Sequence, residues 1–275
     1  MPLEKQKGPV WDSSAECYDD WADYYDMTHG GNDRLPSARF YQDLVTDRTR
    51  CVLELGCGTG VITSAMADRL LEQHASLAGL RVIGVDVSAE MLRVARARDN
   101  RVEWVKGDMR DPRIDGKLDI MICCYNTLQH MLSDEDIGRV FNVVRSLLQP
   151  DGVFAFDIYQ PNFDYLKTPL TDHLARSTTD GQGRVLELRD DTYYDSASRV
   201  LRADWRLVQK HPTGSAILSR GRQYLRQYTA AEVDRLLQRA GLTVAARFGD
   251  LDRSPFTAES KKQVVVCRHR GEGGL

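Results

Sequence analysis

The chain has 275 residues, a formal net charge of −3 at pH 7 and a pI of about 6.1. Its length and its 42% hydrophobic residues suit one large α/β domain with a small insertion, and its dispersed lysines and arginines lack the electrostatic footprint of a nucleic-acid-binding protein. No apolar run approaches membrane-spanning length, and the start, MPLEKQKG, lacks the apolar region of a signal peptide.

The six cysteines and six histidines predict neither a disulfide framework nor a metal site. No Cys-x-x-Cys pair occurs, and apolar strand patterns contain Cys51, Cys123, Cys124 and Cys267. Reduced, buried cysteines are typical of a cytoplasmic protein. The histidines are scattered, without the spacing of metal ligands.

The first predicted element is a helix, rich in aromatic and acidic residues, that begins near Ser13. One helical face contains Tyr18, Trp21, Ala22 and Tyr25. This face predicts an amphipathic helix whose Trp21 packs on the sheet. The Gly30-Gly31 pair would suit a hinge, and a second helix is predicted from Ser37 to Val45.

The decapeptide CVLELGCGTG, from Cys51 to Gly60, predicts a buried strand followed by a glycine turn. An amphipathic helix is expected next, from Val61 to about Leu71. The glycines do not fit the dinucleotide fingerprint G-x-G-x-x-G, because Val61 stands where the third glycine would be. No Lys-Ser or Lys-Thr pair follows them, so a phosphate-binding P-loop is also excluded.

This decapeptide resembles motif I of the class I S-adenosylmethionine-dependent methyltransferases, whose form is close to V/I/L-L-D/E-L/V-G-C-G-T-G. The resemblance implies a doubly wound, seven-stranded, mostly parallel Rossmann-like sheet and S-adenosylmethionine (SAM) as cofactor. It assigns five motif residues to the cofactor site: Glu54, Gly56, Cys57, Gly58 and Gly60.

A second buried strand, RVIGVD, is predicted to end in Asp86. A carboxylate there can accept two hydrogen bonds from the vicinal hydroxyls of a ribose. The alternative is that Asp86 caps the helix predicted from Ala89 to Arg98, but Ser88 is the better N-cap. In the family the acid binds the ribose and the following residues flank the adenine, which here implies Val87 and Met91.

A third strand, from Val102 to Lys106, is predicted to end in Gly107, Asp108 and Met109. The three residues resemble the family's adenine-reading turn. There the aspartate accepts from the exocyclic amine, and the next backbone N–H meets a ring nitrogen. An isolated Gly-Asp pair would ordinarily form an Asx turn, but its place after a third strand favours adenine binding.

A fourth buried strand, from Asp119 to Cys124, runs into the segment YNTLQH. In methyltransferases this strand end lies beside the reactive sulfonium, which implies a cofactor role for Tyr125 and Asn126. Amino-sugar N-methyltransferases have a functional histidine in a similar stretch. We therefore expect His130 to be a general base or an orienting group, since its ordinary pKa suits proton removal near neutrality; a structural histidine is the alternative.

A fifth strand from Val153 to Ile158 completes an alternation of strands and helices that predicts a parallel doubly wound sheet. Ligands of such sheets bind at the carboxyl ends of the strands. Glu54, Asp86, Asp108 and Tyr125 all fall at or near such ends.

Three antiparallel strands are predicted between Arg184 and Tyr228, inserted before a helix from Thr229 to Ala240. Thr229 is expected to be the N-cap of that helix and Gly241 its C-cap. The last two strands are predicted at Thr243–Phe248 and Gln263–Arg268.

The inserted strands resemble the lid of the glycine N-methyltransferase and amino-sugar N,N-dimethyltransferase group. The pattern Y-D-x-W-A-x-Y-Y-D resembles the N-terminal element that closes over the cofactor in many small-molecule methyltransferases. There a tyrosine phenol approaches the methyl donor or the nucleophile, which makes Tyr25 the second catalytic candidate. Tyr18 is assigned to the cofactor and Tyr24 to the acceptor.

Four further residues are acceptor-binding candidates: Gln129, Tyr159, Arg222 and Arg226. The two arginines share a face of the third inserted strand. A face toward an anionic substrate is one interpretation, and a solvated arginine face is the other.

We therefore expect a SAM-dependent methyltransferase that acts on a small molecule. The acceptor would be a secondary-metabolite amine nitrogen or an activated, indole-type aromatic carbon, with a hydroxyl as the alternative. Residues 1–50 would form a helical lid segment, 51–160 the SAM-binding core, 161–228 the strand lid and 229–275 the rest of the core sheet. We expect no nucleic-acid or membrane partner, and a homodimer is compatible with the sequence.

Four other functions compete with this interpretation. A nicotinamide-dependent dehydrogenase is disfavoured by the missing third glycine. A nucleic-acid methyltransferase is disfavoured because Asn126-Thr127-Leu128 stands where amino-directed DNA enzymes have D/N/S-P-P-Y/F/W. An aminopropyltransferase lacks support, since no acidic polyamine channel is evident. A non-catalytic SAM-binding regulatory module stays open, and turnover to S-adenosylhomocysteine would exclude it.

Overall fold

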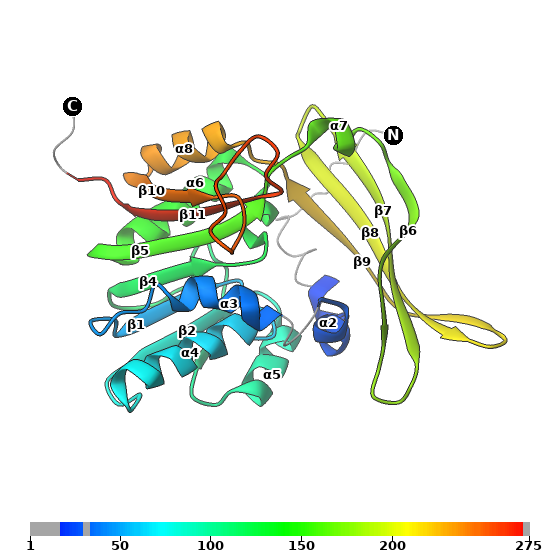
Figure 1. Cartoon of the computed structure of the whole chain (residues 1–275), viewed down its shortest axis with the longest axis horizontal. Coiled ribbons are helices and arrows are strands. Elements are labelled where there is room, and N and C mark those ends of the chain that lie inside the picture. The colour runs from blue at the N-terminus through cyan, green and yellow to red at the C-terminus, as the bar shows by residue number, and fades with distance from the viewer. Residues whose placement is uncertain (1–16, 30–33, 272–275) are drawn as a thin grey trace.

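The computed structural model describes residues 17–29 and 34–271, which form two sheets with helices around the larger one (Figure 1). The larger, core sheet has the strand order β10-β11-β5-β4-β1-β2-β3. Its strands are β1 (Cys51–Leu55), β2 (Arg81–Asp86), β3 (Glu103–Lys106), β4 (Leu118–Cys123), β5 (Leu148–Tyr159), β10 (Leu242–Phe248) and β11 (Lys262–His269). Strand β11 runs antiparallel to both neighbours, and the other adjacent pairs are parallel. The expected seven-stranded, doubly wound sheet is confirmed.

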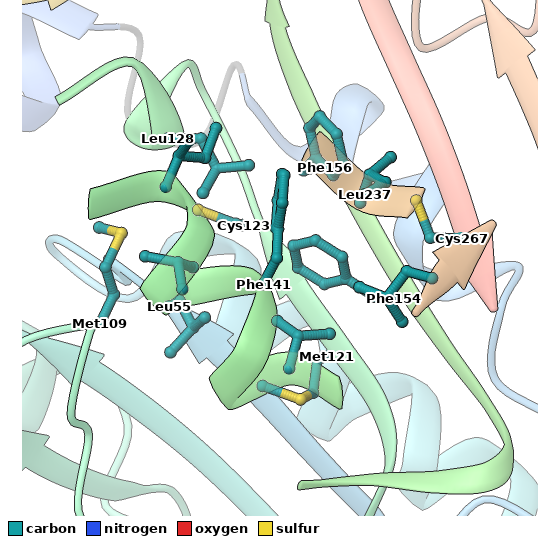
Figure 2. Close-up of a cluster of buried hydrophobic side chains, with 14 of the residues drawn as sticks. Leu55, Met109, Met121, Cys123, Leu128, Phe141, Phe154, Phe156, Leu237 and Cys267 are labelled. Atoms are coloured by element: carbon teal, nitrogen blue, oxygen red, sulfur yellow. The ribbon is translucent and has the colours of Figure 1, made fainter. Parts of the chain in front are cut away.

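Helices cover both faces of the core sheet, because its central strands are apolar on both sides. The helices are α3 (Leu35–Gln42), α4 (Val61–His74), α5 (Ala89–Arg98), α6 (Asp134–Leu147) and α8 (Ala230–Arg239), with a short 3₁₀ helix η2 (Thr127–His130) after β4. Figure 2 shows the cluster under α6 and α8, where Phe141 lies beside Phe154 and Phe156 of β5. A second cluster lies under α3 and α4.

The predicted helix caps are present. The Ser88 hydroxyl accepts from the Met91 N–H at 3.0 Å and begins α5. Thr229 and Glu232 form a reciprocal capping box at the start of α8. Gly241 follows α8 with a φ of +76°, the left-handed conformation that favours glycine after a helix.

The inserted lid sheet has four antiparallel strands instead of the expected three, in the order β6-β7-β8-β9. They are β6 (Leu170–Thr179), β7 (Val185–Asp195), β8 (Val200–His211) and β9 (Gly214–Arg226), and the short helix α7 (Phe163–Leu166) precedes them. The sequence analysis missed β6, because its residues, LTDHLARSTT, are mostly exposed and polar and show no alternating pattern.

The N-terminal helical segment lies between the two sheets, where Figure 1 shows α2 (Ala22–His29). Trp21 is 2% exposed and stacks on Trp205 of β8, with ring centroids 3.8 Å apart. The tryptophan therefore packs on the lid sheet, whereas the sequence analysis expected it on the core sheet. The predicted hinge at Gly30-Gly31 lies outside the described residues.

Within the part of the chain described here, no helix is both long and apolar enough to cross a membrane.

Candidate active site

A cleft with about 730 Å³ of empty space opens at the carboxyl ends of β1, β2 and β4. The N-terminal segment and η2 form its other walls. Its lining consists of Tyr18, Tyr25, Gly56, Gly58, Asp86, Val87, Met91, Gly107, Asp108, Met109, Tyr125, Thr127, His130 and Met131. Twelve of these were predicted as site residues from the sequence, and the fold brings them together from five separate segments.

The glycine turn after β1 approaches the cleft with bare backbone. Gly58 has a φ of +53°, and a Cβ added there would meet no protein atom within 4 Å, so it would project into open space. Gly56 also has a positive φ, and its Cβ would stand 2.2 Å from the Thr127 side chain. Gly60 packs against Trp104 and does not line the cleft. A ligand can therefore contact the backbone most closely at Gly58.

Asp86 lies at the end of β2 with its carboxylate held by the turn. Its two oxygens accept the backbone N–H groups of Gly58, at 2.8 Å, and Ser88, at 2.9 Å. Burial raises the pKa of Asp86, and these hydrogen bonds oppose that rise. Each carboxylate oxygen keeps a further lone pair, so the group can still accept from a vicinal diol.

Asp108 is fixed by a residue that the sequence analysis did not single out. The guanidinium of Arg110 contacts both carboxylate oxygens of Asp108, with the shortest distance 2.6 Å, and reaches Asp136 of α6 at 2.8 Å. The Arg110 backbone N–H also donates to Asp108 at 2.9 Å. The Asx turn that the sequence analysis named as the alternative is thus present. Asp108 also lines the cleft, with its carboxylate paired to an arginine.

Glu54 and Cys57 line a smaller extension of the cleft together with Arg34. Glu54 is 2% exposed and accepts from the Thr63 hydroxyl at 2.5 Å, and burial raises its pKa to about 7. The guanidinium of Arg34 lies 5.2 Å from the ring centroid of Tyr25 and forms a 2.7 Å ion pair with Asp26. The sequence analysis missed Arg34, because no local motif marks it and its contacts with Thr59 and Tyr125 form only in the folded chain.

The turn after β4 holds Tyr125 in the cleft wall through a left-handed backbone. Tyr125 and Asn126 have φ values of +55° and +64°, which are unfavourable for residues with a side chain. Asp157 of β5 satisfies this turn, since its carboxylate accepts the Tyr125 N–H at 2.8 Å and its carbonyl accepts the Asn126 N–H at 3.0 Å. Asn126 itself does not line the cleft.

Three aromatic side chains meet at the end of the cleft formed by η2 and the N-terminal segment. The Tyr18 hydroxyl lies 3.0 Å from Nε2 of His130, and the Tyr18 and Tyr25 rings meet edge to face with centroids 6.0 Å apart. Burial lowers the pKa of His130 to about 4 and raises that of both phenols. All three side chains are therefore uncharged near pH 7.

Comparison with known proteins shows the family to which the chain belongs. A model of the methyltransferase domain family matches residues 52–152. Over 223 residues, the chain is 30% identical to the cypemycin N-terminal methyltransferase of a Streptomyces species, which covers 80% of this chain and 84% of that protein. The chain belongs to the class I SAM-dependent methyltransferases.

Other relatives of this methyltransferase agree with that assignment. It is 27% identical over 151 residues to a dTDP-amino-sugar N,N-dimethyltransferase of Streptomyces fradiae, which covers 53% of this chain and 54% of the relative. The structure of the CcbJ methyltransferase from Streptomyces caelestis matches with a TM-score of 0.69 at 26% identity, over 93% of this chain and 98% of that one. The SAM-bound amino pentose methyltransferase CalS10 has the same fold at 19% identity, with a TM-score of 0.60 over 98% and 99% of the two chains.

Three of the residues predicted to bind the acceptor do not line the cleft of this methyltransferase: Arg222, Arg226 and Gln129. Arg222 pairs with Asp204 at 2.5 Å on the lid sheet, and Arg226 pairs with Asp134 at 2.6 Å. Gln129 is fully buried and joins the Arg226 carbonyl to the backbone N–H of Tyr159. The two arginines are therefore neutralised by structural partners.

Tyr24 and Tyr159 also lie outside the lining of the cleft. Tyr159 is 47% exposed at the end of β5, and the Lys262 ammonium lies 5.8 Å from its ring centroid. Thr127 and Met131, in contrast, line the cleft but were not selected from the sequence. Which side chains of the YNTLQH segment face the cleft depends on the left-handed turn, and nothing in the local sequence signals that turn.

Proposed function

We propose that this methyltransferase transfers the methyl group of SAM to an uncharged amine nitrogen, and that the acceptor is the N-terminal α-amine of a peptide. The proposal rests on the groups that line the two ends of the cleft. One end suits the cofactor, and the other end offers hydrogen-bonding groups without a strong base.

The proposed cofactor site matches SAM part by part. Asp86 would accept the ribose hydroxyls, and Asp108 with the backbone N–H of Met109 would meet the adenine. Arg34 would pair with the carboxylate of the methionine moiety, and the backbone at Gly58 leaves room for the ligand. When bound, SAM supplies an electrophilic methyl group on a sulfonium.

The observation that supports nitrogen as acceptor is the environment of His130. With a pKa of about 4, this histidine is a weak base. A hydroxyl, or the N–H of an indole, must lose its proton to react, and a general base with a pKa near 7 would serve that need. A neutral amine already presents its lone pair, so it needs orientation and proximity rather than deprotonation.

The relatives support a peptide amine in particular. The relative named for N-terminal methylation of cypemycin matches 80% of this chain, a span that must include part of the lid. The amino-sugar N,N-dimethyltransferases match about half of it. The lid lies beside the proposed acceptor end, so likeness there bears on the acceptor more than likeness in the cofactor half.

The test is a methyl-transfer assay with matched acceptors and analysis of the products by mass spectrometry. We expect S-adenosylhomocysteine and a methylated α-amine from short peptides with a free N-terminus. The same peptides with an acetylated N-terminus serve as the control and should give no product. An amino sugar and a hydroxy-acid analogue of the peptide complete the set. Methylation of the hydroxy acid, or of the amino sugar alone, would contradict the proposal.

A further inference from the structure

The Tyr18 hydroxyl lies between a histidine of the core and a glutamine of the lid. It is 3.0 Å from Nε2 of His130 on η2 and 3.3 Å from Oε1 of Gln223 on β9. Gln223 pairs across the lid sheet with Ala203 and lies on the sheet face that also contains Trp205, against the N-terminal segment. Three elements that are far apart in the chain thus meet at one phenol.

The number of available protons decides which group donates in the hydrogen bond between Tyr18 and His130. The phenol has one proton, and the carbonyl oxygen of Gln223 can only accept. When Tyr18 donates to Gln223, its oxygen is left to accept from His130. The histidine then holds its single proton on Nε2 and leaves Nδ1 bare.

The surroundings of Nδ1 agree with this direction. Among the described residues, Nδ1 of His130 is buried and has no hydrogen-bond partner. An orphaned N–H donor is rarer inside proteins than an under-satisfied acceptor. The proton is therefore better placed on Nε2, where Tyr18 accepts it. In this arrangement His130 is a hydrogen-bond donor to Tyr18, which fits an orienting group better than a general base.

We propose that Gln223 is a positioning residue, which sets the direction of the chain His130 to Tyr18 to Gln223 and so turns a free lone pair of the Tyr18 oxygen toward the acceptor. This inference rests on the proposed amine acceptor, whose N–H would donate to that lone pair and point its own lone pair at the methyl group. No covalent step is assigned to the three residues. The lid strand β9 thereby becomes part of the acceptor site.

A structural role alone would not require an acceptor atom at Gln223. In the described part of the chain, the bond to Tyr18 is the one hydrogen bond that the Gln223 side chain makes. Its backbone pairs with Ala203 of β8, an interaction that does not depend on the side chain. Two substitutions can therefore separate a packing role of Gln223 from its role as a hydrogen-bond acceptor. Leucine keeps the side-chain volume but has no acceptor, whereas glutamate keeps an accepting oxygen.

The test compares Gln223→Leu and Gln223→Glu, with Gln209→Leu as the control, because Gln209 lies on β8 near the β8–β9 hairpin. The histidine ring nitrogens are observed by ¹⁵N NMR in the complex with S-adenosylhomocysteine. The His130 signals are assigned by their loss in His130→Gln. We expect the Nε2–H tautomer in the wild type, Gln223→Glu and Gln209→Leu, and a shift toward Nδ1–H in Gln223→Leu. A wild-type Nδ1–H tautomer, or an unchanged tautomer in Gln223→Leu, would overturn the inference.

Kinetics provides the second measurement. In Gln223→Leu, kcat should fall about tenfold, as expected for one lost hydrogen bond, with the Kd for S-adenosylhomocysteine within twofold of the wild type. Gln223→Glu should recover most of kcat. Equal kcat in the two variants would contradict the role. The NMR experiment needs no acceptor, so failure of the proposed amine chemistry and failure of the Gln223 assignment are separate outcomes. If Gln223→Leu does not fold, Tyr18→Phe supplies the tautomer test, because it removes the accepting oxygen.

Discussion

At the scale of single residues, Asp86 serves the protein and the proposed ligand with one carboxylate. It holds the glycine turn through the backbone N–H groups of Gly58 and Ser88, and it lines the cleft. Loss of both ribose hydrogen bonds should weaken SAM binding by about 2–4 kcal/mol in Asp86→Ala. Calorimetry measures this change, with Asp151→Ala, an exposed aspartate near the start of β5, as control. Near-wild-type affinity in Asp86→Ala would show that the ribose binds elsewhere.

The site residues fall into two groups: those that a short sequence motif predicts, and those that no local motif marks. Gly58, Asp86 and Asp108 each occur in a short motif after an apolar strand, so a pattern of a few residues predicts them. Arg34 and Gln223 have no such pattern, because their partners are brought to them by the fold. Gln223 contacts a tyrosine 205 positions away. Sequence reasoning over neighbouring residues can predict the first group and cannot reach the second.

At the scale of elements, the same distinction separates β1 from β6. Strand β1 has four buried residues in a row, so its apolar run marks it in the sequence. Strand β6 is stabilised by ion pairs with the neighbouring strands of the lid sheet. Asp172 of β6 pairs with Arg189 of β7 and Arg206 of β8, and His173 contacts Asp190 of β7. These cross-strand pairs exist only once the lid has formed, which is why β6 could not be predicted.

The turn between β4 and η2 supports a prediction at this scale. Asp157 is fully buried, accepts from the Tyr41 hydroxyl at 2.6 Å and pairs with Lys262 of β11 at 2.5 Å, while it also holds the left-handed Tyr125 backbone. Asp157→Ala would leave the Lys262 ammonium without its counter-charge and should lower the free energy of unfolding by about 3–5 kcal/mol. Urea denaturation measures the loss.

The double variant Asp157→Asn/Lys262→Met tests the cause. It removes both charges and keeps an accepting oxygen for Tyr125. Its destabilisation should therefore be smaller than the sum of those of the single variants Asp157→Asn and Lys262→Met. Strict additivity of the single effects would mean that the Asp157–Lys262 ion pair does not contribute to the free energy of unfolding.

At the scale of the whole molecule, buried titratable groups make stability depend on pH. Burial lowers the pKa of His29 and His130 from 6.5 to about 4, so each contributes stability above pH 6.5 that is lost as the pH falls toward 4. Glu54 acts in the opposite sense. Its pKa rises from 4.5 to about 7 in the folded protein, so its contribution is complete below pH 4.5 and is lost as the pH rises to 7.

The opposite pH dependences of the histidines and Glu54 give a prediction for Glu54→Gln. The neutral amide can keep an acceptor for Thr63 without placing a charge in the core. Unfolding measured from pH 5 to 8 should show the variant gaining stability relative to the wild type as the pH rises, up to about 3 kcal/mol at pH 8. His29→Asn should change the curve at the other end and reduce the loss below pH 6.5. A difference between Glu54→Gln and wild type that stays constant across this range would mean that Glu54 is already ionised in the folded protein, and that Arg34 rather than a proton balances its charge.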